Sequence, residues 1–156
     1  MNKLDDEIEK KANEYYNMCL KYIEQNKTGK KTTYSNELDI VCREIFGVQF
    51  KGIFASDKIP KLSTLAPYCI LNLDRSGEPG SHWVALAKYN NGAMLYDSFG
   101  RDNTTIIKDL RFSGNGKIID TQSDAEQTLI QQNCGARCIA WLLVFHDLGA
   151  EYAKLI

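Results

Sequence analysis

The chain has 156 residues, and 44% of them are hydrophobic, which is enough to build the core of one domain without disulfides or metals. Its 19 basic and 20 acidic residues leave a formal net charge of −1, so overall charge gives no attraction to nucleic acid or to a membrane surface. No apolar run reaches about eighteen residues and the N-terminus is acidic, so we expect neither a membrane-spanning helix nor a signal peptide.

The five cysteines are odd in number and irregularly spaced, a pattern that does not suit a disulfide framework. Cys19, Cys42 and Cys69 each lie within an apolar pattern, and we interpret them as buried small hydrophobic residues. This cysteine usage favours a reducing intracellular compartment.

Helical patterns come first along the chain. Apolar residues recur in steps of three and four from about residue 4 to 25, and again from about 35 to 46. Gly47 follows the second pattern, at a position where a helix often needs a left-handed cap. The sequence therefore predicts two amphipathic helices.

Strand patterns follow the helices, at residues 50–55, 68–74, 82–89, 93–97 and 116–119. The largely apolar segment 68–74 is predicted as a central strand. Asn90-Asn91-Gly92 is a strong hairpin signal between the segments 82–89 and 93–97. Asp102 or Asn103 is placed to cap a short helix that runs through Leu110.

The last predicted helix covers residues 134–148, and it is apolar on every face, so we expect it in the middle of the domain. Helices, then strands, then one central helix make an α+β plan. We predict a single domain over residues 1–156, with a helical part at about 1–47 and a core at about 48–156.

Cys134 is a candidate nucleophile because it precedes Gly135 at the start of that helix. A thiol attacks only as thiolate, and the unpaired N–H groups of a helix start lower a thiol pKa. Most cysteines in intracellular proteins are simply buried thiols, so Cys134 alone would favour packing.

His82 makes a catalytic role for Cys134 more favourable than a packing role. It opens a strand after a Pro-Gly turn and could act as general base. Asp97 ends the strand paired with it through the hairpin, so the carboxylate could orient the imidazole. The alternatives are a surface histidine and a turn aspartate. Trp83 is interpreted as packing or as a wall of the substrate cleft.

Gln127 lies upstream of Cys134, and its side-chain amide could share an oxyanion with the Cys134 backbone N–H. Three other glutamines compete for this role on sequence alone, namely Gln122, Gln131 and Gln132.

Metal binding is the rival chemistry for this region. Cys134 and Cys138 are four residues apart on one predicted helix, and His146 lies on the same element. A structural zinc site needs four ligands in paired short spacings, and no second pair is present in the sequence. A redox pair is disfavoured by the Cys-x-x-x-Cys spacing, so we predict no metal and no cofactor.

The order His82-Trp83, Asp97-Ser-Phe-Gly and Gln127-x6-Cys134-Gly resembles the adenovirus maturation protease (adenain) and its relatives in large DNA viruses, virophages and Maverick/Polinton elements. Their clan includes the SUMO-specific proteases. The similarity covers roughly residues 50–145.

The resemblance implies a papain-like cysteine protease fold, with a mixed sheet packed on a central helix that starts at the nucleophile. By matched position, His82 would be the base, Asp97 the acid, Cys134 the nucleophile and Gln127 the oxyanion donor. It also implies cleavage of capsid or other virion precursors after small residues, often glycine, by a monomer in the virion or host-cell interior.

The chain departs from the adenovirus pattern in its acid, which is Asp97 rather than glutamate, and in ending soon after Cys134. No cysteine lies between Asp97 and Gln127, where the adenovirus enzyme joins an activating peptide. The same triad also suits an isopeptidase for ubiquitin-like modifiers, and the same fold could serve as a catalytically dead binding module. Retention of all four expected residue types argues against the dead module.

Overall fold

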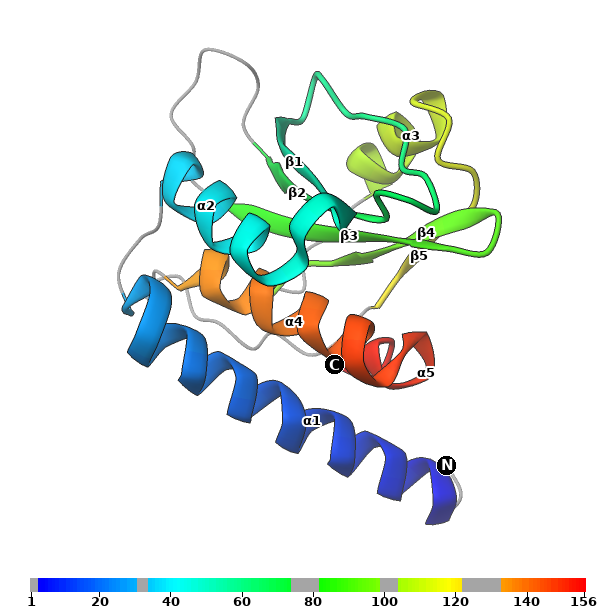
Figure 1. Ribbon diagram of the computed structural model, residues 1–156. Coiled ribbons are helices and arrows are strands. Elements are labelled where there is room, and N and C mark those ends of the chain that lie inside the picture. The colour runs from blue at the N-terminus through cyan, green and yellow to red at the C-terminus, as the bar shows by residue number, and fades with distance from the viewer. Residues whose placement is uncertain (1–2, 31–33, 74–81, 99–103, 122–132) are drawn as a thin grey trace.

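The computed structural model describes residues 3–30, 34–73, 82–98, 104–121 and 133–156 (Figure 1). Its fold is α+β, as predicted, with helices on both faces of a mixed sheet. It is compatible with the papain-like plan that the sequence suggested. No helix of the described ranges is long and apolar enough to cross a membrane.

The sheet has five strands, which lie side by side in chain order. They are β1 (Phe50–Ala55), β2 (Tyr68–Asn72), β3 (Trp83–Tyr89), β4 (Gly92–Tyr96) and β5 (Ile118–Asp120). β2, β3 and β4 pair antiparallel, whereas β1 and β5 each add a parallel edge. The segment predicted as a central strand forms β2, which is an interior strand between β1 and β3, while β3 takes the central place in the sheet.

The predicted hairpin joins β3 to β4. Asn90 has a φ of 52°, the left-handed conformation that asparagine tolerates in such turns. Gly92 is required for a different reason, since a Cβ there would lie 1.7 Å from the Lys117 carbonyl oxygen. The turn sets Ala85 opposite Tyr96, so His82 and Asp97 come to the same open end of the hairpin.

The helices are α1 (Lys3–Ile23), α2 (Ser35–Phe46), α3 (Thr104–Phe112), α4 (Cys134–Leu148) and α5 (Ala150–Ala153). α2 and α4 have the predicted bounds, and α1 continues into a π-helical turn, Glu24–Thr28, that the sequence did not predict. Gly47 ends α2 with a φ of 60°, and its N–H donates to the Arg43 carbonyl, as expected of a left-handed cap.

Two hydrophobic clusters cover opposite faces of the sheet. The larger one lies between the sheet and α1, α2, α4 and α5, and the smaller one lies under α3. Alternate residues of each strand enter different clusters; for example, Ile70 enters the larger and Leu71 the smaller.

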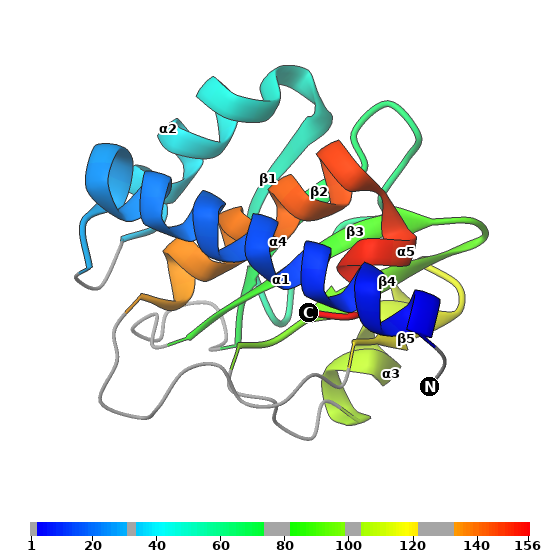
Figure 2. The same ribbon diagram turned by 90° about the horizontal axis from the view of Figure 1, so that it is seen from below.

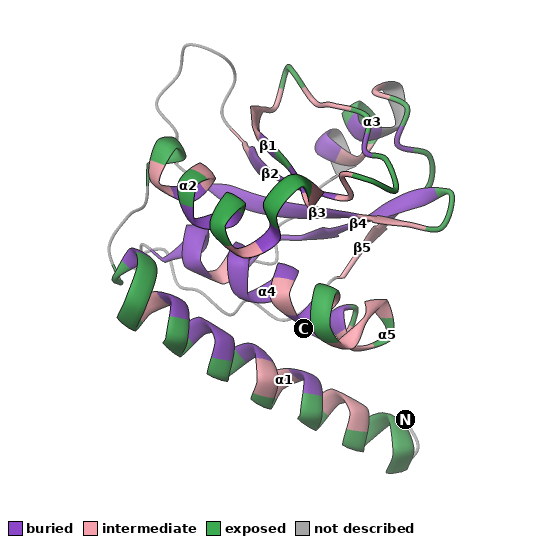
Figure 3. Cartoon of the chain, viewed as in Figure 1, coloured by how far each residue is buried: buried purple, intermediate pink, exposed green. Residues whose placement is uncertain are grey.

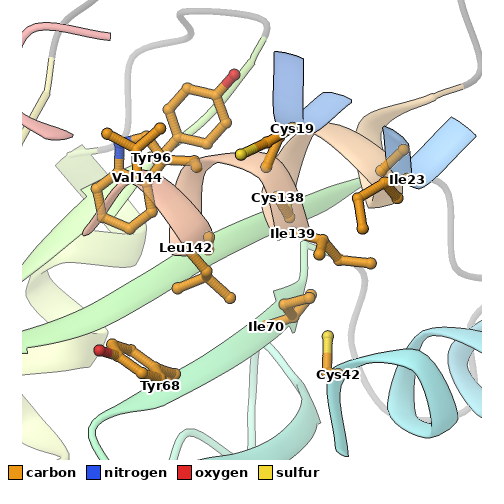
Figure 4. Close-up of a cluster of buried hydrophobic side chains, with 14 of the residues drawn as sticks. Cys19, Ile23, Cys42, Tyr68, Ile70, Tyr96, Cys138, Ile139, Leu142 and Val144 are labelled. Carbon is orange, nitrogen blue, oxygen red and sulfur yellow. The ribbon is translucent and has the colours of Figure 1, made fainter. Parts of the chain in front are cut away.

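α4 is the central helix of the larger cluster, as its apolar composition predicted. Figures 1 and 2 show it between the sheet and α1, and Figure 3 shows how much of it is buried. Figure 4 places Cys138, Ile139 and Leu142 among side chains of the sheet and the neighbouring helices. Trp141 is fully buried, and its indole N–H donates to the Ala153 carbonyl at 2.9 Å. This packing holds the start of α4 at a fixed place against the sheet.

Candidate active site

His82 and Asp97 form a buried pair at the open end of the β3–β4 hairpin. The distance from His82 Nε2 to Asp97 Oδ1 is 2.6 Å, and each side chain is 1% exposed. An ionised carboxylate only accepts hydrogen bonds, so it fixes the tautomer with hydrogen on Nε2. Nδ1 of the neutral ring then carries the lone pair that can take a proton.

Cys134 is the first residue of α4 and lies beside this pair. Its side chain is buried, and the backbone N–H of Trp83, the residue after His82, is directed at its sulfur. The charge of Asp97 also acts on the thiol. The structure therefore brings together three of the predicted site residues, His82, Asp97 and Cys134, which we call the candidate triad.

The pKa of the Cys134 thiol differs from the lowered value that we expected from its position at the start of a helix. Burial raises the pKa of Cys134 above its ordinary value and is the largest influence. Hydrogen bonds from the backbone at Trp83, Gly135 and Cys134 itself lower this pKa, as expected of a helix start, but burial outweighs them. A thiol whose pKa is raised by burial needs a nearby base to become a thiolate.

Trp83 is 4% exposed and packs in the same hydrophobic cluster as Cys134. This position supports the packing interpretation, while its role as a substrate wall stays a prediction. Gln127 and its three competitors, Gln122, Gln131 and Gln132, lie outside the described residues.

A polar network that the sequence analysis did not identify surrounds the start of α4. Arg137 donates through Nε to the Asn133 side-chain oxygen at 3.1 Å and through Nη1 to the Tyr16 hydroxyl at 3.2 Å. The Tyr16 hydroxyl also bonds the Tyr96 hydroxyl at 2.7 Å. The sequence feature that could have indicated this network is Arg137, because it is the one charged residue in the apolar run 134–145.

The other thiols behave as packing residues, as predicted for Cys19, Cys42 and Cys69, which are all buried. Cys138 is fully buried, and burial raises its pKa well above the ordinary value. Within the described ranges, no three His, Cys, Asp or Glu side chains are grouped to hold a metal ion. His146, the third candidate zinc ligand, bonds the Tyr68 hydroxyl at the far end of α4.

Comparison with known proteins gives a short similarity to a viral protein. A stretch of 41 residues is 51% identical to a protein of Acanthamoeba polyphaga mimivirus named "Putative thiol protease R355". The stretch covers 25% of this chain and only 14% of that protein. No protein-family profile matches the chain. The similarity supports a viral thiol protease and says nothing about its substrate.

Proposed function

We propose that this chain is a cysteine endopeptidase that uses Cys134 as nucleophile, His82 as general base and acid, and Asp97 as the orienting carboxylate. The observation that carries the proposal is the buried His82–Asp97 pair beside a cysteine at the start of a central helix. The chain order His, Asp, Cys and the similarity to a viral protein named as a thiol protease support it.

In the first step, His82 Nδ1 takes the proton of the Cys134 thiol. Because burial disfavours an isolated thiolate, transfer inside the site is favoured when the imidazolium remains close and Asp97 stabilises it. The backbone N–H groups around the sulfur stabilise the same thiolate. The result is a thiolate–imidazolium pair whose positive member is held by Nε2–H donation to the carboxylate.

The thiolate then attacks the scissile carbonyl carbon and forms a tetrahedral oxyanion. The Cys134 backbone N–H and the proposed Gln127 amide would stabilise this oxyanion. His82 gives its proton to the leaving amine as the carbon–nitrogen bond breaks, which leaves a thioester on Cys134. Water, deprotonated by His82, attacks the thioester, releases the acid product and restores the thiol.

We propose capsid or other virion precursor proteins as substrates, cut after small residues during particle maturation in the host-cell interior. Trp83 lies next to His82, and a cleft bordered by its backbone would favour residues without large side chains. The substrate assignment follows the resemblance to adenain-like proteases.

The test is co-expression of the chain with the virion precursors of its source, followed by mass spectrometric mapping of the cut sites. We expect cleavage by the wild type and none by Cys134→Ala. Undiminished cleavage by Cys134→Ala would refute the proposal. Activity-based probes made from ubiquitin or SUMO with a vinyl sulfone separate the isopeptidase alternative, since a maturation endopeptidase should not react with them.

A further inference from the structure

The hydroxyl of Tyr16, a residue of α1, is hydrogen-bonded to side chains from two other elements, α4 and β4. This side chain is 2% exposed. Its hydroxyl accepts from Arg137 of α4 and bonds the hydroxyl of Tyr96 of β4. The two tyrosine rings also meet edge to face, with centroids 6.2 Å apart. We call this group, Tyr16, Tyr96 and Arg137, the tyrosine node.

Each partner of Tyr16 is close in the chain to a member of the candidate triad. Tyr96 immediately precedes Asp97, and its ring stacks on Trp141 of α4 at 5.5 Å with an interplanar angle of 4°. Arg137 is one helical turn after Cys134, and its other donor holds Asn133, the residue just before Cys134. The node therefore connects the strand that carries the acid to the helix turn that carries the nucleophile.

From this connection we infer that Tyr16 of the N-terminal helix is a positioning residue, which holds Asp97 and Cys134 in register across the site. The inference rests on the proposed function, because a triad that does no chemistry needs no such register. Its hydroxyl contacts Tyr96 and Arg137, and its influence on the triad runs through these two side chains. In this inference α1 contributes to the geometry of the site through Tyr16.

The hydroxyl matters more than the ring in this arrangement. Arg137 can only donate, so the Tyr16 oxygen accepts from it and remains able to donate its own hydrogen to Tyr96. Phenylalanine at position 16 would leave the fully buried Tyr96 hydroxyl without this partner and would release one arm of the guanidinium. Both side chains would then reorient, and each is joined by backbone to a triad residue.

α1 offers a matched control at the preceding position, Tyr15. The Tyr15 hydroxyl donates to the Asp147 carboxylate, so it also joins α1 to α4, but near the opposite end of α4. Tyr15→Phe and Tyr16→Phe each remove one hydroxyl that joins the same two helices. A purely structural role would leave the pH dependence of Cys134 alkylation unaltered in both variants, whereas a positioning role would alter it in Tyr16→Phe alone.

The deciding measurement is the rate at which iodoacetamide alkylates Cys134 as a function of pH, followed by mass spectrometry. It needs no protease substrate. For Tyr16→Phe we expect a several-fold lower rate near neutral pH and a profile displaced to higher pH, because His82 and Asp97 would stabilise the thiolate less well. Tyr15→Phe should give the wild-type profile. Coincident profiles for the two variants would overturn the inference.

Peptide cleavage supplies the second readout. Tyr16→Phe should lower kcat about tenfold, the effect of roughly one net hydrogen bond, and leave KM within about twofold. If Cys134→Ala cleaves as well as the wild type, the proposed function fails. If Cys134→Ala is inactive and Tyr16→Phe behaves like Tyr15→Phe, the proposed function stands and the positioning role is wrong.

Circular dichroism and thermal unfolding show whether Tyr16→Phe folds. Should it fail to fold, Arg137→Lys answers the same question from the half-exposed partner, because lysine keeps the charge but cannot bridge Tyr16 and Asn133 with one planar group. The same displaced alkylation profile is expected for Arg137→Lys. A wild-type profile from a folded Arg137→Lys would count against the node.

Discussion

The two ends of α4 hold the same types of side chain in different arrangements. The candidate triad lies at the N-terminal end. The C-terminal end carries a second histidine and aspartate, His146 and Asp147, and the charge of Asp147 acts on the buried Cys19 thiol of α1. Residue types alone would therefore nominate either end as a site.

Hydrogen-bond partners and solvent exposure distinguish the two ends. His146 is exposed and its Nδ1 bonds the Tyr68 hydroxyl at 3.0 Å, while Asp147 accepts from Tyr15. At the triad end the histidine and the aspartate bond each other, and both are buried. A buried charge-assisted hydrogen bond can orient a base, whereas an exposed histidine bonded to a phenol has no such constraint. The hydrogen bond between His82 and Asp97, together with the burial of both side chains, therefore distinguishes the candidate site from the C-terminal end of α4.

The largest expected effect separates the two cysteines. Cys134→Ala should reduce peptide cleavage by more than about ten-thousand-fold, because the substitution removes the sulfur that forms the thioester. Cys19→Ala, which removes the buried thiol that the charge of Asp147 acts on, should keep wild-type kcat/KM within about threefold while it lowers stability through lost packing. Steady-state kinetics on the mapped cleavage peptide give both values. Activity lost equally in both variants would remove the distinction.

The two histidines come next. His82→Ala should lower kcat/KM by about a thousandfold, in the range that removal of a general base usually costs. His146→Ala should lose only its contact with Tyr68 and leave kcat/KM nearly unchanged. Active-site titration with an alkylating peptide corrects each rate for the fraction of competent enzyme. A comparable loss in His146→Ala would place the catalytic base at the wrong end of α4.

The two aspartates should differ less. Asp97→Asn keeps the shape of the side chain but removes the charge that stabilises the imidazolium. We expect a loss in kcat of roughly tenfold to a hundredfold, the effect of one charge-assisted hydrogen bond. Asp147→Asn is the matched change at the other end and should leave kcat unaltered. If both substitutions are silent, the 2.6 Å pair has no part in catalysis.

The features that the sequence predicted well depend on local signals. Asn90-Asn91-Gly92 marks the hairpin, Gly47 marks the end of α2, and the continuous apolar run marks α4 as central. The hairpin register then brings His82 and Asp97 together, so most of the candidate triad could be predicted.

The features it missed depend on contacts between distant parts of the chain. Parallel pairing of β1 and β5 with their neighbours has no local pattern that specifies it. The bond between Tyr16 and Arg137 joins residues 121 positions apart, and periodicity showed only that Tyr16 faces the core. The thiol pKa direction was missed for the same reason, because burial of Cys134 depends on how α4 packs against the sheet.

The smallest expected effect concerns Cys138, one turn along α4 from the nucleophile towards the opposite end. Burial raises its pKa well above the ordinary value of 9.0, so at pH 7 the thiol is protonated in both folded and unfolded chains. Above pH 9.0 the unfolded thiol ionises while the folded one does not, which favours unfolding. Between pH 9 and 10 this thiol alone should reduce the free energy of unfolding by about 1 kcal/mol.

Cys138→Ala should lower stability at pH 7 through the lost packing, yet flatten the decline at alkaline pH. Ile139→Val, a change at the next buried position that introduces no titrating group, should lower stability by a similar amount at every pH. Urea unfolding from pH 7 to 10 measures both slopes. Because the comparison concerns slopes, the constant cost of each smaller side chain cancels. Equal slopes for wild type and Cys138→Ala would mean that the Cys138 thiol ionises as readily in the folded protein as in the unfolded chain.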